Sequence, residues 1–189
     1  MVPLILGLIV FLGIHSVRIV APRWRDRQLA AMGEGRWKGI YSLVSAAGLV
    51  LLVWGYGEAW EVAPVLYEPP VWMKHIAAPL MFVAFVSLMT FVFPAGRLKP
   101  AFKHPFLLAV QIWAFAHLLA NGDLASVILF GAFLAWALAD RLAVAYRGEP
   151  APQPGPVKWD ILAVGSGAVF FVLFMWRLHL WLIGVPPLG

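Results

Sequence analysis

The chain contains no cysteine, and charged residues make up only 12% of its 189 residues. Without cysteine there is no disulfide scaffold, no thiolate zinc site, no iron–sulfur cluster and no cysteine nucleophile. A Gly-X-Y period is missing as well, which excludes collagen, and polar residues are too few for a disordered chain. HExxH motifs, Walker motifs and a Ser–His–Asp arrangement are also missing.

Apolar residues dominate what is present. They make up 62% of the chain, whereas a soluble domain has about 45–50%. Six apolar stretches have lengths that suit helices of roughly 20 residues, and the alternation of barrel strands is missing. We therefore expect an all-α integral membrane helical bundle with about six transmembrane helices, forming a single domain over residues 1–189. The stretches are Val2–Val20, Gly39–Tyr56, Val71–Phe93, Pro105–Ala120, Leu124–Ala139 and Trp159–Ile183.

Basic residues indicate the orientation of the chain in the membrane. Twelve of the fourteen Lys and Arg residues fall in the connections after the first, third and fifth stretches. Basic loops stay in the cytoplasm, so both termini are expected outside. The first stretch has no basic residues before it, so we interpret it as a retained helix and not as a signal peptide. The formal charge of +5 is then a topology signal. We therefore do not expect a nucleic-acid partner. The apolar stretches predict the lipid bilayer as the partner of the chain.

Histidines are the polar residues that most need an explanation, because a polar group in hydrocarbon is costly. His75, His104 and His179 lie near span ends, where an ordinary interfacial role suffices. His15 and His117 lie several residues inside apolar spans, and neither has an acidic neighbour three or four residues away. Two interpretations stay open for these two rings. Each bonds a serine or a backbone carbonyl of another helix, or each is a ligand.

The direction of the two helices favours a ligand role. Side chains lean towards the helix N-terminus, so His15 and His117 lean towards the mid-plane from opposite ends. Their depths differ by about 10 Å, which is awkward for two groups at one depth but acceptable for ligands above and below one flat ring, because both side chains lean to close the gap. Two imidazoles across a porphyrin are a common way to hold haem b between helices. Arg18 would then meet a propionate, and Phe11 and Trp113 would pack on the macrocycle; ordinary interfacial and packing roles are the alternatives.

Four sequence blocks resemble a known family. They are GIHSVR at residues 13–18, GEGRWKGIYSLVS at 33–45, KHP at 103–105 and AHLLANGD at 116–123. Together they resemble the NnrU family of bacterial membrane proteins over nearly the whole chain. That family includes the 15-cis-zeta-carotene isomerases of plants and cyanobacteria, whose haem b is ligated by the histidines of the HS and AH blocks. Those residues correspond to His15 and His117. Plant members carry a cysteine where this chain has Ala114, so a ligand exchange involving cysteine cannot occur here.

The resemblance implies a multi-pass protein of the bacterial inner membrane that binds haem b and has a redox or nitric-oxide and denitrification-linked role. A redox role would require a redox partner. One alternative is a cis–trans isomerase of a polyene such as zeta-carotene, and only this alternative makes the protein an enzyme. A second alternative is a haem-free transporter or assembly factor. Its polar residues would be Gln111, Asn121, Asp123 and Arg177.

Overall fold

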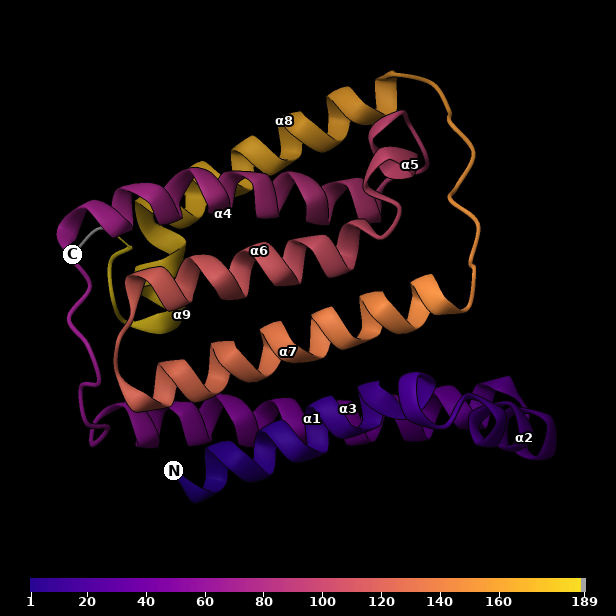
Figure 1. Ribbon diagram of the computed structural model, residues 1–189, viewed down its shortest axis with the longest axis horizontal. Coiled ribbons are helices and arrows are strands. Elements are labelled where there is room, and N and C mark those ends of the chain that lie inside the picture. The colour runs from indigo at the N-terminus through magenta and orange to yellow at the C-terminus, as the bar shows by residue number, and fades with distance from the viewer. Residues whose placement is uncertain (188–189) are drawn as a thin grey trace. The chain divides into compact units, whose positions relative to one another are not determined.

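A computed structural model describes residues 1–187, and the chain is helical along most of that length (Figure 1). No strand occurs among these residues, and Val65 and Asp123 form an isolated antiparallel bridge. This confirms the expected all-α class. The helices are α1 Val2–Val20, α2 Pro22–Met32, α3 Glu34–Trp60, α4 Val71–Val92, α5 Leu98–Phe102, α6 Pro105–Ala120, α7 Leu124–Tyr146, α8 Lys158–Leu173, the π-helix η1 Phe174–Leu178 and α9 His179–Ile183.

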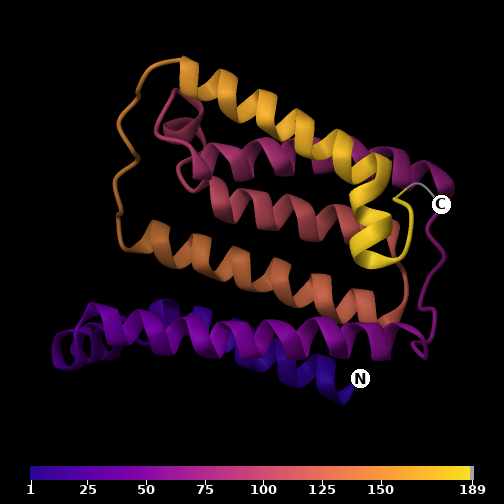
Figure 2. The same cartoon turned by 180° about the vertical axis from the view of Figure 1, so that it is seen from behind.

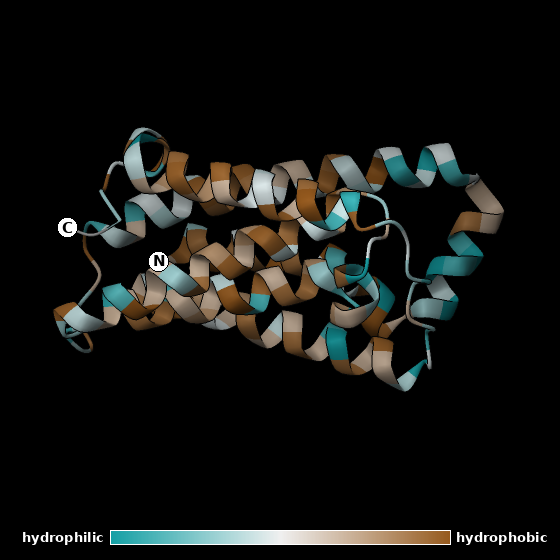
Figure 3. Cartoon of the chain, turned by 90° about the horizontal axis from the view of Figure 1, so that it is seen from above, coloured by the Kyte–Doolittle hydropathy of each residue, from teal (hydrophilic) through white to brown (hydrophobic). Residues whose placement is uncertain are grey.

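All six apolar stretches are helical, and within residues 1–187 five helical segments are long and apolar enough to cross a membrane. The fifth of these segments is formed by α8, η1 and α9 together, over Lys158–Ile183. Helix α6 is apolar but has 16 residues, which gives a length of about 24 Å against a hydrocarbon core of about 30 Å. Hydropathic colouring shows brown along the long helices and teal on α2 and the loops (Figure 3). The chain is thus a multi-pass membrane protein.

Helices α7 and α3 are longer than the apolar stretches they contain, and one further helix lies outside the stretches. Helix α7 continues to Tyr146, about two turns beyond the predicted end at Ala139. Helix α3 begins before its apolar run, at Glu34. The short polar helix α2 was not expected at all; it starts at Pro22, which suits the first turn because its missing N–H is not needed there. Most of α2 consists of Arg, Gln, Leu, Ala and Met, which are good helix formers.

The chain divides into two compact units. The first contains Met1–Tyr67 and Gly122–Ala143, and the second contains Glu68–Asn121 and, among the described residues, 144–187. In the first unit, α1 and α3 run side by side (Figures 1 and 2). Their backbones approach closely at glycines, as in many membrane helix pairs. A Cβ placed on Gly7 would lie 2.5 Å from the Leu52 backbone, and one placed on Gly48 would lie 2.8 Å from the Phe11 nitrogen.

Helix α7 joins the first unit through polar and aromatic contacts. The hydroxyls of Tyr56 and Ser126 are 2.9 Å apart. The Asp123 carboxylate accepts the Ser126 backbone N–H at 2.8 Å, which caps the start of α7. The Leu124 N–H donates to the Pro64 carbonyl at 3.0 Å, which ties the start of α7 to the segment that follows α3.

In the second unit, α4 packs against α6 and α8. Gly167 of α8 allows the close approach, because a Cβ there would lie 2.9 Å from the Val86 backbone. The Asp160 carboxylate accepts the backbone N–H groups of Arg97 and Leu98 at 2.8 and 3.0 Å, and so ties the start of α8 to the start of α5.

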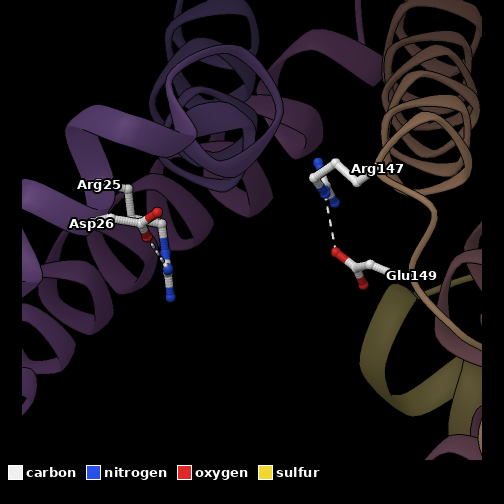
Figure 4. Close-up of polar contacts among 4 residues, drawn as sticks. All are labelled: Arg25, Asp26, Arg147 and Glu149. Carbon is white, nitrogen blue, oxygen red and sulfur yellow. Dashed lines mark hydrogen bonds and ion pairs between the residues drawn. The ribbon is translucent and has the colours of Figure 1, made fainter.

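Each unit also carries a surface ion pair (Figure 4). In the first, Arg25 lies 3.2 Å from Asp26; in the second, Arg147 lies 3.0 Å from Glu149. Pairs of this kind contribute about 1 kcal/mol or less. They show that some of the basic residues used to predict the orientation are partly neutralised. Placement of both termini outside stays a prediction.

Candidate functional site

The first candidate ligand, His15, lies in α1 with its ring held by its own helix. Its Nδ1 is 2.6 Å from the carbonyl oxygen of Phe11, one turn earlier. A carbonyl oxygen only accepts, so we assign the proton to Nδ1, which leaves the lone pair on Nε2. A histidine that ligates a metal commonly donates its other N–H to a carbonyl in this way.

Three aromatic side chains surround the His15 ring. The centroid of Phe11 is 4.4 Å away, that of Tyr41 in α3 is 5.2 Å away and that of Trp136 in α7 is 6.1 Å away. The indole nitrogen of Trp136 is buried and has no hydrogen-bond partner among residues 1–187. The unit therefore builds an aromatic enclosure around one imidazole.

Tyr41 and Trp136 were not predicted as site residues. Trp136 carried a sequence signal that could have been used, because it lies inside an apolar stretch and not at its end. Phe11 was predicted to pack on the macrocycle, and this stays a prediction; its ring contacts His15. Arg18 lies exposed near the end of α1, three residues after His15.

The second candidate ligand, His117, lies near the end of α6, and its ring is also held by the carbonyl and beside the aromatic ring of the residue four positions earlier. Its Nδ1 is 2.8 Å from the carbonyl oxygen of Trp113, and the Trp113 ring centroid is 5.4 Å from the imidazole. Asn121 completes the end of the helix, because its side-chain amide donates to the His117 carbonyl at 2.9 Å. Ala114, in the turn before His117, is fully buried.

A third histidine joins the second unit's site, although the sequence indicated an ordinary role for it. The His179 ring centroid is 6.4 Å from that of His117, and the two planes differ by 19°. Figure 1 shows α9, which begins at His179, beside the end of α6. The remaining two histidines, His75 and His104, lie at an exposed position of α4 and at the N-cap of α6.

The described residues contain no group of three or more His, Asp or Glu side chains that could hold a metal ion. Two of the polar residues assigned to a haem-free transporter have local structural roles, since Asn121 ends α6 and Asp123 caps α7. The donor set that the structure offers consists of single imidazoles with Nε2 as the donor atom. This chemistry suits an iron porphyrin, which needs only one or two axial nitrogen ligands.

Comparison with known protein families identifies the family of this chain. The profile of the family described as NnrU protein covers residues 3–187, nearly the whole chain, which confirms the resemblance drawn from the four sequence blocks. No curated protein and no solved structure matches the chain.

Proposed function

Because the chain belongs to the NnrU family, we propose that it binds one haem b through His15 and His117 in the bacterial inner membrane. The proposed role is redox or nitric-oxide-linked, as in denitrification. Catalytic residues are not assigned, because neither axial imidazole touches a substrate in this proposal.

One observation carries the proposal. Both imidazoles have Nδ1 directed at the carbonyl oxygen four residues earlier, at 2.6 Å for His15 and 2.8 Å for His117. The same tautomer results at both positions, with the lone pair on Nε2, the donor atom that an axial ligand needs. The hydrogen bond also fixes the orientation of each ring.

Side chains near the two imidazoles would suit the propionates and the macrocycle of a porphyrin. Arg18 is three residues from His15 on α1, the spacing at which two side chains share a helix face. Its guanidinium would pair with a propionate. Phe11 and Trp113 already contact the two imidazoles and would extend their apolar surroundings. When bound, haem supplies one-electron redox chemistry at iron.

Two histidine ligands would limit the chemistry that the haem can supply. If His15 and His117 both held the iron, no coordination position would be open, so electron transfer or sensing, together with a redox partner, would fit best. Direct chemistry on nitric oxide would require one histidine to leave. The polyene isomerase stays an alternative on the family resemblance, and Ala114 gives it no thiolate ligand.

Absorption spectroscopy of purified protein, expressed with ample haem, tests the proposal. We expect a Soret band and the sharp α and β bands of a low-spin haem after reduction. His15→Ala should lose the low-spin spectrum, while His75→Ala, a change at an exposed position of α4, should keep it. Colourless wild-type protein would refute haem binding and favour the transporter or assembly factor. Conversion of a cis-polyene by the reduced protein would favour the isomerase.

A further inference from the structure

His179 shares the feature that identified the two candidate ligands. Its Nδ1 lies 2.7 Å from the carbonyl oxygen of Val185. The same reasoning assigns the proton to Nδ1 and the lone pair to Nε2. Within residues 1–187, His15, His117 and His179 are the histidines for which such a ring-to-carbonyl hydrogen bond is found.

The local backbone is shaped to hold this ring. His179 follows directly on the π-helix Phe174–Leu178, and wide turns of this kind are often found at functional sites. Gly184 then adopts a left-handed conformation, with φ +86°, so that the chain turns back. This reversal brings the Val185 carbonyl to Nδ1 across six residues. An interfacial histidine would need none of these features, because water or headgroups would satisfy its ring.

His179 lies beside His117, the candidate ligand of the same unit. Its ring lies nearly parallel to that of His117, at a centroid distance of 6.4 Å, and both rings belong to the same unit. Two imidazoles in the same tautomer are therefore presented side by side where a single axial ligand is needed. To exchange one Nε2 for the other, the His179 side chain would rotate between staggered conformations and release its hydrogen bond to the Val185 carbonyl.

We propose that His179 is a substitute axial ligand, able to bind iron in place of His117. This inference rests on the proposed function, since it presupposes the haem. The exchange breaks the bond from His117 Nε2 to iron and forms the bond from His179 Nε2. Each imidazole would bind iron through Nε2 with its proton kept on Nδ1, so the exchange gains or loses no proton or electron.

Four proteins test this: the wild type, His117→Ala, His179→Ala and the double variant, each measured by absorption and by electron paramagnetic resonance of the ferric state. His179→Ala should remain low-spin, because His117 is intact. His117→Ala should also remain largely low-spin, because His179 replaces it. The double variant should lose the low-spin signal and become five-coordinate through His15. His117→Asn repeats the test with a polar side chain of similar size, in case the alanine variant does not fold.

The outcomes separate the two proposals. If His117→Ala and His117→Asn already lose the low-spin signal as completely as the double variant, the role of His179 is refuted and His117 stands as the ligand. If the double variant remains low-spin, neither histidine is the ligand and both proposals fall. If the wild type binds no haem under any supply, the proposed function is refuted and this inference with it.

Discussion

Replacing Gly7 by alanine tests how closely α1 must approach α3. The new Cβ would lie 2.5 Å from the Cα and the nitrogen of Leu52, whereas carbon atoms in contact are about 3.5–4.0 Å apart. The obstacle is backbone, which cannot rotate away as a side chain would. The two helices must therefore separate by about 1 Å, and overpacking of this kind costs about 1–3 kcal/mol.

Gly13 provides a matched control on the same helix, since a Cβ there meets nothing within 4 Å. Gly13→Ala should be neutral or stabilising by about 0.5–1 kcal/mol, because alanine is the better helix former. Thermal unfolding of detergent-solubilised protein, followed by circular dichroism, measures both variants. A loss of about 1–3 kcal/mol corresponds to a fall in Tm of about 2–12 °C for a chain of this length.

The Gly7→Ala substitution should also affect the surroundings of His15. His15 is eight residues after Gly7, about 12 Å along α1, and its ring contacts Tyr41 of α3 at 5.2 Å. Separation of the helices should weaken this contact, so Gly7→Ala should also lower the haem content per protein relative to Gly13→Ala. Equal Tm values for the two variants would refute the reasoning that the glycine permits the close approach.

Three further predictions follow from the two units. Asp123→Ala removes the cap that accepts the Ser126 N–H, so unfolding should become easier by about 0.5–2 kcal/mol, and Asp123→Asn should restore most of this in the same thermal assay. Gly167→Ala should lower Tm because its Cβ would lie 2.9 Å from the backbone of α4, whereas Gly165→Ala, with nothing within 4 Å, should not; equal effects would contradict the packing argument. Haem supply during expression should raise the Tm of the wild type, because bound haem adds about 2.7 kcal/mol to the free energy of unfolding at a free haem concentration of one hundred times Kd. The Tm of His15→Ala should rise less. An equal rise in both proteins would argue against His15 as a ligand.

Some of the candidate site was predictable because it lies within single helices. Phe11 and His15 are four residues apart, as are Trp113 and His117, and the helical period places each pair on one face. The ring contacts at 4.4 and 5.4 Å follow from that spacing. The hydrogen bonds from Nδ1 to the carbonyl four residues earlier have the same local origin.

Other helix features were missed because hydropathy alone does not define them. The predicted end of the fifth stretch fell before Asp140 and Arg141, but α7 continues to Tyr146. Arginine, leucine and alanine, which make up most of this extension, are good helix formers. Helix α2 has no apolar run, so no hydropathic pattern could indicate it.

The sequence by itself determined the all-α membrane class, the apolar helices, the family and the two histidines inside apolar spans, because each depends on composition or on neighbours within one or two helical turns. Only the tertiary structure placed Tyr41 and Trp136 at His15, and His179 beside His117. These residues are far apart along the chain. What brings them together is packing between helices, set by close approaches at glycines such as Gly7 and Gly167 and by a π-helix that redirects the last span. A helical period cannot encode such contacts, because it relates residues only along one axis.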